Sequence, residues 1–274
     1  MKILVSSDIH VHAGILPEVL DIARQNKVDV IVIPGDIVPK DIYYGNGYIE
    51  SQRAYLRDIF LPKFEEFKAT EQTKDIKIYL DMGNDDFIAN RPILEAHNGK
   101  EFNLLHMERH EITEDVDILG YMCVPVTPFG IKDWEKIDTK KHKWAPLQVP
   151  TTRGWFTSSG EVRSGEIDVG SDDTIETDMK ELSKMVRKKF IFVSHTPPYN
   201  TNLDMLSNGW HVGSLAVRKF IEKWGKKKMM VASFHGHIHE SPYISNNVME
   251  IIADVKCYNY GQIGQKTKYG FFEI

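Results

Sequence analysis

The chain has little cysteine and no long apolar run. Its 274 residues include two cysteines, Cys123 and Cys257, which are too few for a disulfide framework and lack a paired metal-binding spacing. A reducing cytoplasm is therefore the simplest expected location. No apolar run approaches membrane-spanning length, and the apolar stretch at residues 1–5 is too short for a signal peptide, so we expect no membrane partner.

An excess of positive charge is also missing. The chain carries 34 Lys and Arg against 39 Asp and Glu, a formal net charge of -5. A protein that binds nucleic acid through broad positive charge has the opposite balance, so we do not expect nucleic acid as a partner. The net charge does not exclude a locally basic groove. The length allows one large domain or two small ones, and 42% hydrophobic residues suffice for a sizeable core.

The apolar run at residues 30–33 stops abruptly at Pro34-Gly35-Asp36. Such a short β-branched run predicts a buried strand. With a strand at 2–7 and a helical apolar stripe at 16–25, it forms a β-α-β unit whose strands are parallel neighbours. We therefore expect Asp8, His10 and Asp36 to lie at one edge of a sheet, where α/β proteins place their chemistry.

Three later predicted strands also end in polar residues. The strand at 76–80 precedes Gly83-Asn84, the strand at 190–194 precedes His195, and the strand at 229–234 precedes Gly236-His237-Ile238-His239. Alone, each motif is more often a cap or a turn than a functional site. Together they supply seven oxygen and nitrogen ligands, about the number that two divalent ions need.

Two loops stand out. Residues 41–48 are rich in Gly and Tyr, and residues 128–173 show no sustained periodicity but contain Trp134, Trp144 and Trp155. So long a loop is unusual unless it is functional. Two interpretations stay open for 128–173: a surface insertion with its own aromatic cluster, or a lid over the edge where the ligands gather.

The motifs D-x-H, G-D, G-N, H and G-H-x-H occur in the same order, from residue 8 to 239, in the calcineurin-like metallophosphoesterases, which this chain resembles. The run Pro197-Pro198-Tyr199 and residues 211–214 and 236–240 look most like small stand-alone microbial members. The resemblance implies a four-layer αββα sandwich of two mixed β-sheets flanked by helices. It also implies one domain over residues 1–274, with an irregular insertion at about 128–173.

The same resemblance implies a dinuclear site for two divalent metal ions. It assigns Asp8, His10, Asp36 and His239 to one ion and Asp36, Asn84, His195 and His237 to the other. Asp36 is thus the expected bridge. Because the set mixes nitrogen and oxygen ligands without cysteine, Mn, Fe and Zn are all compatible.

One residue departs from the family pattern. Members usually have His after Gly-Asn, where it is thought to help the leaving group depart, and this chain has Asp85. A carboxylate beside two cations should be ionised, which makes it a poor general acid. His211, whose loop follows His195, is the alternative catalytic candidate, ahead of His12.

The expected function is metal-dependent hydrolysis of a small phosphoester, with a nucleotide-type phosphodiester favoured. The resemblance implies attack by a metal-bridging hydroxide. Two alternatives stay open: a catalytically weak or inactive scaffold that keeps the fold, supported by the missing His, and a nuclease, which the acidic charge balance disfavours. The oligomeric state stays open.

Overall fold

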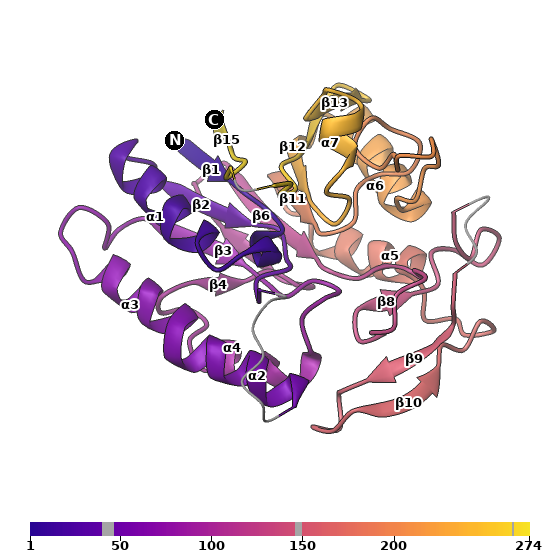
Figure 1. Cartoon of the computed structure of the whole chain (residues 1–274). Coiled ribbons are helices and arrows are strands. Elements are labelled where there is room, and N and C mark those ends of the chain that lie inside the picture. Colours follow the sequence, from indigo (N-terminus) through magenta and orange to yellow (C-terminus); the bar gives the residue numbers. More distant parts are fainter. Residues whose placement is uncertain (40–46, 146–149, 265) are drawn as a thin grey trace.

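The computed structural model describes residues 1–39, 47–145, 150–264 and 266–274. Two large mixed sheets form its centre, and helices flank them on both outer sides (Figure 1). The four-layer α/β architecture expected from the sequence is confirmed. Most of the Gly- and Tyr-rich loop expected at 41–48 lies outside the described residues.

The first sheet has the strand order β15-β1-β2-β3-β4. Strands β1 to β4 are parallel, and β15 pairs antiparallel with β1. Its strands are β1 (Lys2–Val5), β2 (Val30–Ile33), β3 (Lys77–Leu80), β4 (Asn103–Leu104) and β15 (Gly270–Glu273). The β-α-β crossover that the apolar pattern predicts is present, with α1 (Ile15–Gln25) between β1 and β2.

The second sheet has the order β13-β14-β12-β11-β6-β5. Its four inner strands are parallel, and β13 and β5 close it as antiparallel edges. Its strands are β5 (Arg109–Glu111), β6 (Val116–Tyr121), β11 (Lys189–Ser194), β12 (Met230–His235), β13 (Met249–Ile252) and β14 (Val255–Asn259). The buried apolar side chains of both sheets belong to one continuous cluster.

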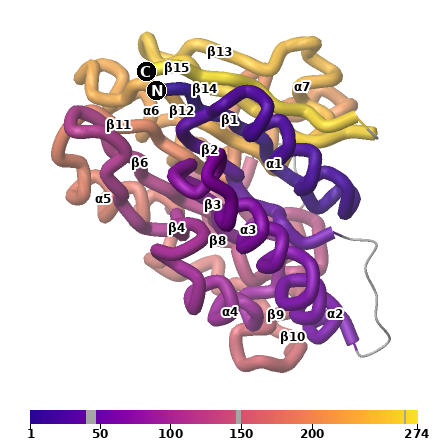
Figure 2. Tube along the Cα trace, turned by 90° about the vertical axis from the view of Figure 1, so that its left-hand side faces the viewer, coloured from indigo at the N-terminus to yellow at the C-terminus, as the bar shows by residue number. Residues whose placement is uncertain are grey.

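Helices of the first half of the chain cover the first sheet, and later helices cover the second. Figure 2 looks onto α1 and α3, with the first sheet behind them. The helices are α1 (Ile15–Gln25), α2 (Tyr48–Tyr55), α3 (Leu61–Lys68), α4 (Arg91–Glu95), α5 (Ile175–Met185), α6 (Leu215–Lys226) and α7 (Ser241–Ile244). None of the described helices combines the length and hydrophobicity needed to cross a lipid bilayer.

The helical region from residue 48 to residue 68 is not one regular α-helix. A π-helical stretch (Leu56–Phe60) joins α2 to α3, and Leu61 N donates to the carbonyl of Leu56, five residues back. Pro62 follows at the start of α3 and has no N–H to donate. The wider turn accommodates that missing donor without breaking the helix.

The segment 128–173 contains short strands. β7 (Val124–Pro125) pairs with β8 (Glu135–Lys136), and β9 (Arg153–Phe156) pairs with β10 (Arg163–Glu166) as a hairpin set apart from the two large sheets (Figure 1). Trp134 is buried, but Trp155 is 54% exposed. Trp155 lies on the outer hairpin and does not share a buried cluster with Trp134. The interpretation of this segment as a lid stays a prediction.

Candidate metal centre

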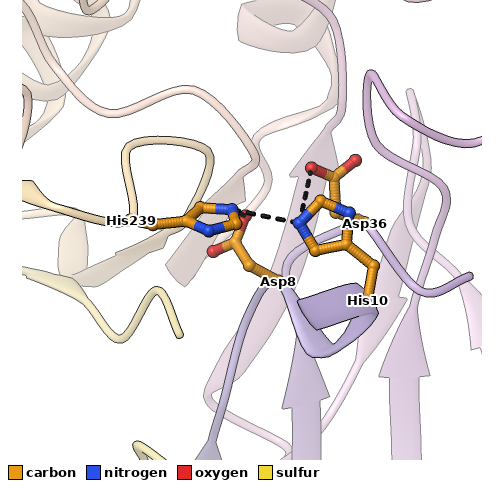
Figure 3. A group of neighbouring side chains, drawn as sticks. All are labelled: Asp8, His10, Asp36 and His239. Carbon is orange, nitrogen blue, oxygen red and sulfur yellow. Dashed lines mark hydrogen bonds and ion pairs between the residues drawn. The ribbon is translucent and has the colours of Figure 1, made fainter. Parts of the chain in front are cut away.

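Four ligand-type side chains meet where β1, β2 and β12 end. Asp8, His10 and Asp36 are buried, His239 is partly buried, and one ligand atom of each lies within 4.8 Å of the others (Figure 3). His239 Nε2 is 3.1 Å from His10 Nε2 and 3.2 Å from Asp8 Oδ1. Atoms that share one ion are about 3 to 3.5 Å apart when each lies about 2.1 Å from it. The spacing therefore fits a metal ion.

A second group surrounds His195 at the end of β11. His195 Nε2 lies 3.0 Å from Asn84 Oδ1 and 3.3 Å from Asp36 Oδ2. The ring of His237 lies 5.3 Å from that of His195, measured between centroids. The structure thus brings Asn84, His195 and Asp36 into contact, with His237 beside them. The assignment of these residues to a second ion stays a prediction.

Asp36 is the residue that both groups share. Its Oδ2 atom lies 3.7 Å from His10 Nε2 and 3.3 Å from His195 Nε2. The other oxygen, Oδ1, accepts a hydrogen bond from the N–H of Asp85 at 2.9 Å, which fixes the carboxylate plane. An oxygen between the two ligand groups is placed to contact an ion on either side, as a bridging carboxylate does.

Local backbone geometry aims these side chains. Asp8, Asp36 and His237 have positive φ angles of 55°, 55° and 67°. Left-handed residues turn the chain sharply where a strand ends, and such positions cost of order 1–3 kcal/mol each. Asp tolerates this region better than most residues, and His is also enriched there. The strained backbone therefore coincides with the ligand positions.

The glycines of the motifs allow the strand ends to approach closely. A Cβ on Gly83 would lie 2.3 Å from Asp36 Oδ1 and 2.7 Å from His195 Nε2. A Cβ on Gly236 would lie 2.6 Å from Asp8 Oδ2. Since real Cβ atoms do not approach so closely, only glycine fits at both positions. The G-N and G-H-x-H patterns thus have a steric cause.

The ionisation of the cluster follows from burial and from neighbouring charges. Burial opposes ionisation of both carboxyls, but His239 holds the pKa of Asp8 below its usual range, and His195 and His10 hold that of Asp36 well below it. Both carboxylates are therefore ionised, and each ionised oxygen can accept a cation.

The histidines divide into two kinds. Burial lowers the pKa of His10, and burial together with the charge of His195 lowers that of His237 to about 3. For His195 burial also acts to lower the pKa, but the carboxylate of Asp36 outweighs it and raises the pKa to about 9. In the metal-free protein a proton on His195 thus partly offsets the buried negative charge, a role that a cation can take over.

Backbone carbonyls determine which imidazole nitrogens face the site. His195 Nδ1 donates to the carbonyl of Pro34 at 2.6 Å, so Nε2 is the nitrogen that faces Asn84 and Asp36. Such outer contacts fix the tautomer of a metal-binding histidine. His235 instead points inward, where its Nδ1 lies 3.1 Å from the carbonyls of Ser194 and Thr196. It supports the fold and takes no part in the cluster.

Two supporting residues escaped the sequence reasoning. Asn259, at the end of β14, donates to the carbonyls of Leu203 and Ile238 at 2.9 and 3.1 Å and so holds the loop that carries His237 and His239. Gln52 on α2 donates to the carbonyl of Asp85 at 2.9 Å. Asn259 could have been recognised as one more polar residue at a parallel strand end, but Gln52 carries no sequence signal.

The two catalytic candidates lie in different surroundings. Asp85 Oδ2 is 3.2 Å from His10 Nδ1, and Asp85 Oδ1 accepts from Asn84 Nδ2 at 3.2 Å, so this carboxylate touches one member of each ligand group. His211 Nδ1 is held 2.8 Å from the buried Asp204. Within the described residues, no contact recorded for His211 joins it to the cluster.

Comparison with known proteins identifies the family. The sequence profile of the calcineurin-like phosphoesterases matches residues 1–241. An uncharacterised protein of Methanocaldococcus jannaschii is 36% identical over 90 residues, which make up 31% of this chain and 40% of that protein. The chain therefore spans well under half of that relative. With the ordered motifs and the fold, the profile match shows that the chain belongs to the calcineurin-like phosphoesterase family.

Solved structures agree with the fold. A Thermus thermophilus protein superposes with a TM-score of 0.54 at 14% identity, covering 95% of this chain and 88% of that one. A dimetal phosphatase from Danio rerio gives a TM-score of 0.55 at 10% identity, covering 94% and 86%. At identities this low, the similarity shows a common architecture and does not identify a substrate.

Proposed function

We propose that this chain is an active metal-dependent phosphodiesterase with a dinuclear centre, and that nucleotide-type diesters are its favoured substrates. The single observation that carries the proposal is the position of Asp36 Oδ2 between His10 and His195. The proposed ligands are Asp8, His10, Asp36, Asn84, His195, His237 and His239. The dimetal phosphatase with the same architecture is consistent with two ions.

Each part of the centre has a defined task. When bound, two divalent cations supply a hydroxide nucleophile at neutral pH and offset the charge of the phosphoryl oxygens. The two buried carboxylates, Asp8 and Asp36, hold the cations in place through their charge. Asp85 does not act as the acid that the family usually has. It braces His10 and Asn84, one residue of each ligand group, and so keeps the two positions at a fixed separation.

The preference for a diester rests on the space around the centre. Two cavities adjoin the segment 237–239: His237 and Ile238 line one of about 250 Å³, and His239 lines another of about 440 Å³. A phosphodiester has two ester arms, whereas a monoester has one. Two cavities lined by neighbouring residues of one loop support a substrate with an arm in each.

The test is turnover of bis(p-nitrophenyl) phosphate with added Mn, Fe or Zn, compared with p-nitrophenyl phosphate. We expect metal-dependent diester hydrolysis that exceeds monoester hydrolysis and disappears in Asp36→Asn. Metal binding without turnover of any ester would favour the scaffold alternative. Salt-sensitive retention on single-stranded DNA or RNA, with cleavage, would revive the nuclease.

A further inference from the structure

The cavity beside His237 has an aromatic and apolar lining. Phe129 and Trp210 contribute large rings that are 54% and 37% exposed, and the buried Val212 and Ile238 belong to the same lining. The full lining is Thr127, Pro128, Phe129, Leu206, Asn208, Trp210, Val212, His237 and Ile238. Apart from the ligand His237, none of these described lining residues has an ionisable side chain. The cavity therefore suits an uncharged apolar group.

Buried charges hold the Phe129 wall. The N–H of Phe129 donates to Thr127 Oγ1 at 3.0 Å, and the N–H of Thr127 donates to Glu135 Oε2 at 3.0 Å. Lys132 Nζ donates to the Thr127 carbonyl at 2.9 Å and to Glu135 at 2.7 Å, with both side chains of this ion pair fully buried. This buried, hydrogen-bonded pair holds the backbone of residues 127–129, so the position of Phe129 in the chain is set before any ligand arrives.

A tight turn holds the Trp210 wall. Asn208 Oδ1 accepts from the N–H of Trp210 at 3.0 Å, and the N–H of Leu206 donates to the carbonyl of Trp210 at 2.8 Å. Gly209 between them has a φ of 81°, a conformation that favours glycine. Trp210 and Val212 both face the cavity, while His211 between them turns to Asp204. The Trp210 wall is therefore preorganised as well.

We propose that this cavity is a specificity pocket that receives a planar aromatic ring from one ester arm of the substrate. The inference rests on the proposed function, because the pocket can receive an ester arm only if the phosphoryl group of the substrate binds beside His237. Its volume of about 250 Å³ is below the roughly 300–1,000 Å³ of complete ligand sites, so it fits one part of a substrate. Two aromatic rings offer stacking faces to a nucleobase or an aryl group, and the amide of Asn208 can donate to a ring acceptor.

The test uses two ligands that differ only in the ring. Phenylphosphonate and methylphosphonate share the metal-binding group, and isothermal calorimetry on the Mn-loaded protein measures their binding without turnover. Stacking of one ring is worth about 1–3 kcal/mol, so phenylphosphonate should bind roughly 5- to 150-fold more tightly. Phe129→Ala and Trp210→Ala should each remove most of this preference and leave methylphosphonate binding unchanged. Trp210→Phe should retain most of it.

A matched control separates the two cavities. Tyr243→Ala removes an exposed ring from the lining of the cavity beside His239 and should leave the phenyl preference intact. Equal binding of the two phosphonates by the wild type, or loss of the preference in Tyr243→Ala alone, would overturn the pocket assignment. A protein that binds phenylphosphonate selectively but turns over no ester would keep the pocket and reject the proposed hydrolase. Unchanged methylphosphonate binding in the variants excludes misfolding as the cause.

Discussion

The carboxylate of Asp85 lies 3.2 Å from Nδ1 of His10, on the side of the ring opposite the nitrogen that faces His239 and Asp36. The contact is electrostatic and lacks the alignment of a hydrogen bond, and a negative charge this close to the imidazole increases its basicity as a ligand. The residue that departs from the usual family sequence thus has a definite partner. Its position favours a positioning role over acid catalysis.

This contact predicts a metal-affinity defect in Asp85→Asn. Loss of an outer carboxylate typically weakens metal binding by about 10- to 100-fold, and we expect an effect of that size on the first ion released. Competition with a fluorescent chelator measures it. The exposed Asp58→Asn should behave as the wild type. If Asp85→Asn binds Mn as tightly as the wild type, Asp85 does not strengthen His10 as a ligand.

A second prediction concerns the leaving group. Without an acid at position 85, the rate should depend steeply on the stability of the leaving alkoxide, so that aryl diesters react well and alkyl monoesters poorly. Asp85→His should flatten the slope of rate against leaving-group pKa. A flat slope in the wild type that steepens in His211→Ala would instead identify His211 as the acid.

The shared position of Asp36 predicts that its loss disturbs both ions. Purified wild type should carry about two transition-metal equivalents, Asp36→Asn should lose metal from both positions, and Asp8→Asn should mainly weaken one. Elemental analysis of the three proteins provides the measurement. Two ions retained in Asp36→Asn would end the bridging assignment.

The buried pair of Lys132 and Glu135 predicts that substitutions at the two positions have strongly non-additive effects on the free energy of unfolding. Burial raises the pKa of Glu135 to about 7 even beside Lys132, so in Lys132→Met this carboxyl must take up a proton or stay charged without a partner. Lys132→Met should therefore lower the free energy of unfolding by about 3–5 kcal/mol. The double variant Lys132→Met/Glu135→Leu should be more stable than Lys132→Met. Urea unfolding monitored by circular dichroism tests this. Additive losses in the double variant would contradict the coupling.

His106 predicts acid sensitivity of the fold. Burial, together with the charge of Arg91, lowers its pKa from 6.5 to about 3, and its Nδ1 accepts from the N–H of Met122 at 3.0 Å. Because the folded pKa lies below the unfolded one, this contribution is present above pH 6.5 and is lost as the pH falls. The loss between pH 7 and pH 5 should be roughly 2 kcal/mol.

His106→Asn keeps an acceptor near the position of Nδ1 and does not titrate, so its stability should fall less between these pH values. The exposed His142→Asn serves as the control. Thermal unfolding at several pH values measures the difference. Parallel pH profiles for wild type and His106→Asn would show that His106 contributes nothing to the acid sensitivity.

Much of the centre could be predicted because its determinants are local. A short apolar run that ends at Gly-Asp or Gly-Asn encodes both the strand and the turn after it, and parallel strands bring such ends to one edge. The fold class and the family that these patterns predict are confirmed by the structure and by the family profile. The metal assignments, including that of His237, and the catalytic roles of Asp85 and His211 stay predictions.

The aromatic pocket could not be predicted in this way. Phe129 and Trp210 lie in irregular segments about eighty positions apart, and nothing in the local pattern of either indicates the other. Their proximity depends on the Lys132 and Glu135 pair and on a Gly209 turn, which form only when the chain is folded. The exposure of Trp155 could not be predicted either, because composition alone does not reveal which side of a hairpin a ring occupies.

The left-handed conformations of Asp8 and Asp36 set the direction in which this chain could be engineered. Glycine adopts such angles without a Cβ penalty, so in the absence of ions Asp36→Gly should unfold less readily than Asp36→Ala by about 1 kcal/mol. Glycine is therefore the substitution that removes a ligand carboxylate at these two positions with the least strain on the backbone. An alanine variant would combine the loss of a ligand with backbone strain, so screens for stable variants should hold the two aspartates constant.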